Sequence, residues 1–227
     1  MKYLFLLLLC IFFISACQSD LEKCEEAQHM GNFYMLQDSK SFLAYQENQT
    51  RVIFSDSLDT EYVGNINRYN TFLGLVLSSK TELCPYDEDI ILEHRHNREV
   101  TVVEITFPEL NLNILCNLSV MVDTEYNNSK EIYDELSIFL RNENSTSILT
   151  SMGINIQNRN DFIPTVSTSV FHEDFDLLGR SYKNVFSHND NYTIVEDYEL
   201  YYNKTQGIVG FKSLVDPKFS YKFERIE

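Results

Sequence analysis

The chain has 227 residues, with 34 acidic and 18 basic side chains and a formal net charge of −16 at pH 7. This balance argues against nucleic acid and anionic lipid headgroups as partners, because both are recognised through clusters of Lys and Arg. The length suffices for one large β domain. Abundant Tyr and Phe with no Trp favour strands and disfavour a carbohydrate cleft built on indole stacking.

The first residues form a targeting segment. Lys2 precedes an apolar run from Tyr3 to Ile14, which suits an export signal and falls short of the roughly 20 residues that a membrane-spanning helix needs. The run ends in Ile14-Ser15-Ala16-Cys17, which resembles the lipobox of bacterial prolipoproteins. The resemblance implies that residues 1–16 are a signal peptide and that Cys17 is lipidated. The alternative is an ordinary secretory signal, with Cys17 a bystander or a disulfide partner.

The resemblance also implies a location. Two or more acyl chains on Cys17 anchor a protein stably to a membrane, whereas one chain does not. In enterobacterial lipoproteins an Asp after the lipidated cysteine signals retention at the inner membrane, and Gln18 stands there instead. We expect a lipid-anchored protein of the outer membrane of a Gram-negative bacterium, facing either the periplasm or the cell surface. Residues 17–32 are the expected lipidated N-terminus and tether, and residues 33–227 the expected antiparallel β domain.

The remaining cysteines allow at most one internal disulfide. Cys24 falls in the expected tether, which leaves Cys84 and Cys116 as a pair. Their disulfide would close a loop of about thirty residues and contribute roughly 3 kcal/mol in an oxidising compartment. Alternatively, Cys116 is a small buried hydrophobe on the apolar face of a strand. Both interpretations stay open.

Strand patterns dominate the first half of the domain, and the clearest follows Pro108. Apolar residues occupy every second position from Leu110 to Val120, with mostly polar residues between them. Because side chains alternate faces along a strand, this pattern predicts a half-buried antiparallel strand. Leu112 and Ile114 are predicted in the core, and Asn111 and Asn113 on the water face. Earlier strands are predicted at residues 51–54, 61–66, 71–78, 90–92 and 99–107.

The second half begins with an ambiguous stretch. Residues 128–141 are interpreted as a short helix, with a strand at 136–141 as the alternative, because Ile132, Leu136 and Leu140 share a helical face. Residues 142–161 are predicted to be a long loop with an embedded short element. Short loops then separate strands predicted at residues 166–171, 175–178, 181–186, 192–202, 206–212 and 219–226.

The fold prediction is all-β, as an antiparallel sandwich or an incomplete barrel, with one or two short helices. The C-terminal part also resembles that of many uncharacterised outer-membrane lipoproteins of Gram-negative bacteria, through Leu178–Phe186, Tyr201-Tyr202-Asn203-Lys204 and Gly207–Lys212. This resemblance implies an antiparallel β lipoprotein and carries no activity.

Two groups of residues could carry chemistry. His94 and His96 share a face of a strand, and Glu93 or Asp87–Asp89 could complete a metal site, but a solvated strand end is favoured because no third ligand is fixed by spacing. The acidic groups Asp87–Asp89 and Glu173–Asp176 could bind calcium or act as paired carboxylates, but solvated turns are favoured. We therefore assign no catalytic, metal or cofactor residue and predict no cofactor.

A row of aromatic residues is the last feature. Tyr198, Leu200 and Tyr202 either pack between strands, which is favoured, or line a groove for a ligand. We expect a noncatalytic binding or structural module of the envelope, whose partner is a small apolar or glycan ligand or an envelope protein. The alternative is an envelope hydrolase that uses carboxylates or a metal held by His94 and His96.

Overall fold

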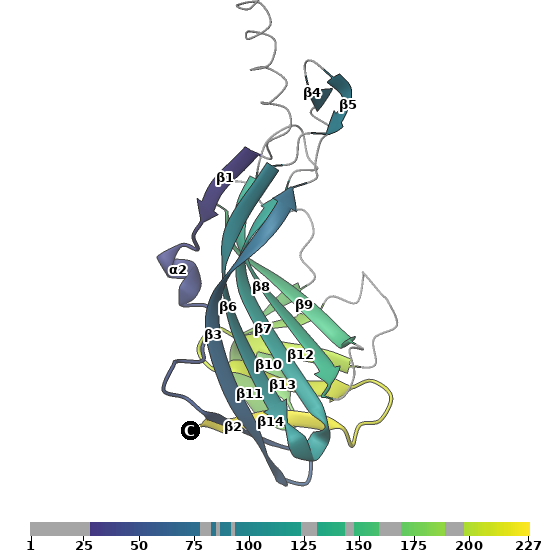
Figure 1. Cartoon of the computed structure of the whole chain (residues 1–227). Helices are drawn as coiled ribbons and strands as arrows, with labels where there is room; N and C mark the ends of the chain where they lie inside the picture. Colours follow the sequence, from purple (N-terminus) through teal and green to yellow (C-terminus); the bar gives the residue numbers. More distant parts are fainter. Residues whose placement is uncertain are drawn as a thin grey trace, which may run out of the picture.

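The computed structural model describes residues 28–77, 83–84, 87–91, 94–123, 131–143, 148–158, 169–188 and 198–227. In this part of the chain, a single large sheet curls into a nearly closed antiparallel barrel (Figure 1). The all-β prediction is confirmed, and of its two architectures the incomplete barrel is the correct one.

The strands follow one another around the barrel almost in chain order. The C-terminal strand β14 pairs with β2 and thereby joins the two halves of the chain. The order is β10 (Ser169–Leu177), β11 (Arg180–His188), β12 (Tyr198–Asn203), β13 (Gly207–Ser213), β14 (Ser220–Ile226), β2 (Arg51–Ser55), β3 (Glu61–Leu77), β6 (His94–Phe107), β7 (Leu112–Asp123), β8 (Glu131–Asn142) and β9 (Ile148–Asn158).

The remaining elements are short. β1 (Gln28–Phe33) pairs with β6 in parallel, so paired structure begins inside the range predicted to be tether. The helix α2 (Gln37–Lys40) follows it, and a 3₁₀ turn, η1 (Pro108–Leu110), links β6 to β7. β4 (Leu83–Cys84) and β5 (Asp87–Ile91) form a separate two-stranded sheet.

The two ends of the sheet, β9 and β10, approach each other without pairing. β9 contacts β10, β11 and β12 across this gap. A polar contact also bridges it, because Nδ1 of His188 on β11 lies 2.8 Å from the carbonyl oxygen of Ser151 on β9. These contacts hold the barrel nearly closed.

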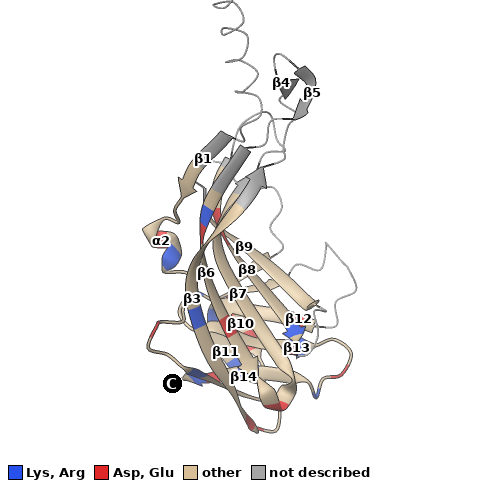
Figure 2. Cartoon of the chain, in the orientation of Figure 1, with Lys and Arg blue, Asp and Glu red and all other residues tan. Residues whose placement is uncertain are grey.

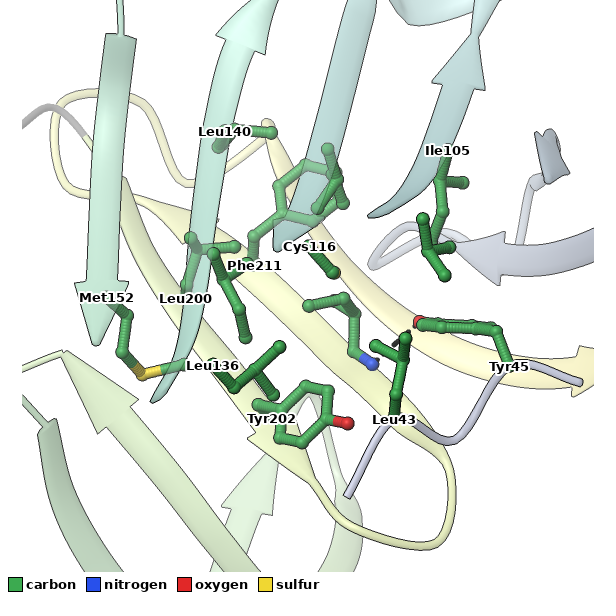
Figure 3. Close-up of a cluster of buried hydrophobic side chains, with 14 of the residues drawn as sticks. Leu43, Tyr45, Ile105, Cys116, Leu136, Leu140, Met152, Leu200, Tyr202 and Phe211 are labelled. Atoms are coloured by element: carbon green, nitrogen blue, oxygen red, sulfur yellow. Dashed lines mark hydrogen bonds between the residues drawn. The ribbon is translucent and has the colours of Figure 1, made fainter. Parts of the chain in front are cut away.

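The barrel interior is filled by apolar side chains. On β7 the residues Leu112, Ile114, Cys116, Leu118 and Val120 are all buried, which confirms the predicted alternation. Figure 3 shows Cys116 of β7 among side chains from β8, β9, β12 and β13, including Leu136, Met152 and Phe211. The core therefore joins both halves of the sheet.

The prediction for the outer face of β7 is only half right. Asn111 is exposed, with a left-handed backbone (φ 53°) at the end of η1. Asn113, however, is only 6% exposed, and its side-chain NH₂ donates to Oε1 of Glu104 at 2.6 Å. Arg141 on β8 also reaches that oxygen, at 3.2 Å. Neighbouring long side chains thus cover the outer face, which alternation alone does not reveal.

Ile114→Ala is expected to cost about 2–5 kcal/mol of stability, because it leaves a cavity in the core. Asn113→Ala is expected to cost about 1–3 kcal/mol, because it removes a hydrogen bond to a charged carboxylate. Urea melts of both variants check this, with Asn65→Ala, at an exposed residue of β3, as the matched control. A cost for Asn113→Ala no larger than the control's would contradict the buried contact to Glu104.

Two favoured interpretations of the second half are wrong. Residues 131–142 form strand β8, so the alternative of a strand at 136–141 is correct and the helix is not. Residues 148–158 form strand β9 within the predicted long loop. Leu136 and Leu140 fit both a helix and a strand. Their spacing of four residues is a multiple of the strand period of two and is close to the helix period of 3.6 residues. Buried Ile138 between them fits only the strand, which pairs with β7 along its whole length.

A second apolar cluster lies outside the main core. Leu177, Tyr182, Val185, Tyr201 and Val209 form it where the β10–β11 hairpin packs on β12 and β13. The hydroxyl of Tyr182 donates to the carbonyl of Phe223 at 3.2 Å, and Nη1 of Arg180 donates to the same oxygen at 2.7 Å. The hairpin tip is therefore fixed to β14.

Buried tyrosines make stability sensitive to alkaline pH. Burial raises the pKa of Tyr182 and of Tyr221 to about 12, and it also raises the pKa of Tyr45 and of Tyr202 well above the ordinary value of a tyrosine. The unfolded chain releases these protons near pH 10, whereas the native state keeps them. We expect full stability below pH 10 and a decline as the pH rises above it. Tyrosinate absorbance and near-ultraviolet circular dichroism monitor this decline. Complete tyrosine titration near pH 10 without unfolding would contradict the burial.

Candidate functional site

The feature that stands out for interaction is one edge of the long strand β3. β2 covers one edge of β3 only from Glu61 to Asn65, while β6 covers the other edge from Asn65 to Leu77. Among the described residues, no strand pairs with the β2 side of β3 beyond Asn65. This edge, residues 70–77, is called the β3 edge below.

No β-bulge interrupts the β3 edge, because its pairing with β6 runs from Asn65 to Leu77 without a register shift. Proteins normally blunt long exposed edges with charges, prolines or bulges, because the unpaired N–H and C=O groups are a template for another strand. Residues 70–77 contain no charged residue and no proline.

Apolar side chains flank the β3 edge on both faces of the sheet. Tyr69 and Leu73 lie on one face and are 46% and 44% exposed. Phe72 lies on the other face, is 50% exposed, and meets the ring of Tyr34 edge-on with ring centroids 5.6 Å apart. An added strand would therefore find apolar contacts above and below it.

The charge around the β3 edge differs from that of the whole chain. From Tyr62 to Thr81 the sequence contains no Asp or Glu, although the chain carries 34 of them. Within β3, Glu61 and Arg68 are the charged residues, and Figure 2 shows the rest of the described strand uncharged. The acidic character that repels other acidic surfaces is thus missing here.

The segment after β1, residues 34–45, positions Tyr34 beside this edge. It crosses from β6 and β8 towards β12 and β13, held by two carboxylates of the barrel. Oε2 of Glu99 accepts from the backbone N–H of Met35 at 2.9 Å, and Oδ2 of Asp134 accepts from that of Leu36 at 3.0 Å. Lys40 pairs with Glu99 at 2.6 Å. This fixes the segment next to Phe72.

The same segment ends in the core. Tyr45 is fully buried, and its hydroxyl oxygen accepts a hydrogen bond from the backbone N–H of Ile208 at 2.8 Å. Arg68 of β3 donates to the carbonyl of Tyr45, and the hydroxyl of Tyr202 donates to the carbonyl of Phe42. Figure 3 shows Leu43 and Tyr45 reaching into the cluster from this segment.

The side chains of the alternative metal site fall outside the described residues. His94 and His96 fall at the start of β6, but their side chains lie outside the described residues, as do Glu93 and the side chains of Asp87–Asp89. Among the described side chains, no group of three or more His, Cys, Asp or Glu could hold a metal ion. The hydrolase alternative stays a prediction.

The second acidic group is exposed, on strand β10 and not on a turn. Asp174 pairs with Lys183 across the β10–β11 hairpin, and Asp176 accepts from Ser181. These carboxylates face water and a hairpin partner, which agrees with a solvated group.

The aromatic row of β12 packs between strands, as favoured from the sequence. Leu200 and Tyr202 are buried in the main core, and Tyr201 lies in the second cluster. Tyr198 is partly buried against the main core. The packing interpretation is confirmed.

Cys116 is fully buried, its thiol is free among the described residues, and burial raises its pKa to about 12. The side chain of Cys84 lies outside the described residues, so the disulfide with Cys84 stays a prediction. Cys17 also lies outside them.

Comparison with protein-family models, with curated proteins and with solved structures found no match to this chain. Within the described residues, no helix is long and apolar enough to cross a membrane.

Proposed function

We propose that this protein is a noncatalytic module of the cell envelope, anchored through lipid on Cys17, which binds a protein partner along the β3 edge. The observation that carries the proposal is an uncharged strand edge, free of pairing among the described residues from Asn70 onward and flanked by exposed Tyr69, Phe72 and Leu73. Extended peptides bind such edges by adding a strand, with main-chain hydrogen bonds for affinity and side-chain contacts for specificity.

The geometry favours an extended protein segment over a small ligand. The barrel interior is occupied by side chains of the core and by Leu43 and Tyr45 of the crossing segment. The exposed side chains of Tyr69, Phe72 and Leu73 instead follow the direction of β3, so a partner segment that lies along β3 contacts all three. The lipobox resemblance of Ile14-Ser15-Ala16-Cys17 supports a place for this binding at a membrane surface.

Photo-crosslinking in intact cells tests the proposal. A benzophenone amino acid replaces Tyr69 beside the edge or, as the matched control, Leu58, which is 84% exposed on the β2–β3 turn. We expect a discrete adduct from position 69 and none from position 58. The adduct is expected to disappear when Asn70→Pro removes an edge N–H. Equal adducts from both positions, or none from position 69, would overturn the proposal.

A further inference from the structure

We infer that the partner at the β3 edge is a second copy of this chain, paired antiparallel about a two-fold axis. This inference rests on the proposed function and names its partner. It follows from the direction of the backbone groups, the side chains on both faces, and the charge along the edge.

The backbone groups of the edge point outward at every second residue. The N–H of Ile66 donates to the carbonyl of Thr50 at 2.8 Å, on the side of β3 away from β6. Because successive residues of a strand point their backbone groups to alternate sides, Asn70, Phe72 and Gly74 present N–H and C=O to the same open side. A second strand can bond to all three without disturbing the pairing with β6.

A symmetric pairing matches the side chains of this edge. About a two-fold axis at Phe72, Asn70 lies opposite Gly74 of the second copy and Phe72 opposite Phe72. On the other face, Thr71 lies opposite Leu73. Directly opposed aromatic and aliphatic side chains stabilise an antiparallel pair, so both faces are self-complementary.

Charge also favours self-association at this edge over the edge of β10, which is one end of the sheet. Two copies of a chain with net charge −16 repel each other over most of their surfaces. In the pairing described, Arg68 lies opposite Val76, so no like charges meet. The edge strand β10 carries exposed Glu173, Asp174 and Asp176 instead, which oppose a second copy.

Anchoring strengthens a small interface of this kind. Both copies would be held at one membrane through Cys17, and tethering raises the effective concentration of partners without any new contact. The test therefore uses the purified mature lipoprotein in liposomes that contain no other protein.

The benzophenone probe is placed at Phe72 or, as the control, at Leu58. We expect an adduct with the mass of two chains from position 72 only. It should be lost with Leu73→Lys, which places like charges along the edge, and with Asn70→Pro. It should persist with Leu58→Lys, which adds the same charge at an exposed residue on the β2–β3 turn.

Three results would overturn the inference: no two-chain adduct from position 72, the same adduct from position 58, or an adduct that persists unchanged in Leu73→Lys. The contrast between the two probe positions decides the matter even if Asn70→Pro fails to fold. A discrete adduct in cells, of another mass, together with no dimer in liposomes would refute self-pairing and leave the proposed function standing. No adduct in either setting would refute both.

Discussion

Tyr45→Ala is expected to lower the free energy of unfolding by about 3–5 kcal/mol, a large part of the roughly 5–15 kcal/mol that stabilises a typical domain. Tyr45 is fully buried, and its ring fills the space directly over Gly207, where even a Cβ would overlap with it. The substitution leaves a cavity in the core and an unpaired N–H on Ile208. It also loosens the segment that holds Tyr34 beside Phe72.

Tyr45→Phe separates the two effects. It keeps the ring and removes only the oxygen that accepts from Ile208, so we expect a cost of about 1–3 kcal/mol for the unpaired donor. Leu58→Ala, at an exposed turn residue, should stay within about 0.5 kcal/mol. Urea melts of the three variants give the comparison. A cost for Tyr45→Ala no greater than for Tyr45→Phe would mean that the ring does not fill the core.

Cys17→Ser is expected to remove the protein from the membrane. If the lipobox interpretation is correct, the serine variant has no thiol to receive the lipid, and the acyl chains that provide stable anchoring are lost. Detergent phase partitioning should then move the protein to the aqueous phase, and radioactive palmitate should no longer label it. Cys24→Ser is the matched control and should label as the parent does. Equal labelling of the Cys17 variant would show that the lipobox interpretation is wrong.

Some strands were predicted correctly from the sequence and others were not, and the difference lies in the residue pattern of each strand. The alternation from Leu112 to Val120 identified β7 because few other structures bury every second residue. β8 was mistaken for a helix because Leu136 and Leu140 suit both periods. β9 was mistaken for a loop because Asn and Ser residues surround its few inward-facing side chains, Met152 and Ile154 among them. Its pairing with β8 decides its structure, and this pairing is not local information.

The candidate site could not be predicted in the same way. Whether Asn70 or Phe72 lies at a free edge depends on where β2 stops pairing and on which strand comes next in the sheet. A short sequence window contains neither fact. One signal was present, the absence of Asp and Glu from Tyr62 to Thr81 in a strongly acidic chain. It marks a region that differs from the rest of the surface, and the structure adds that, within the described residues, no strand pairs with the β2 side of β3 beyond Asn65.

The pairing of β14 with β2 has a consequence for the rate of folding. Ser55 and Glu224, which share a hydrogen bond at 2.5 Å, are 169 residues apart in sequence. Bringing such distant strands together costs loop-closure entropy before their stabilising contacts form. Folding should therefore be slow compared with that of a protein with mostly local contacts. A slowly folding chain stays extended for longer. Slow closure would therefore suit a polypeptide that crosses a membrane before it folds, as the export signal predicted for residues 1–16 requires.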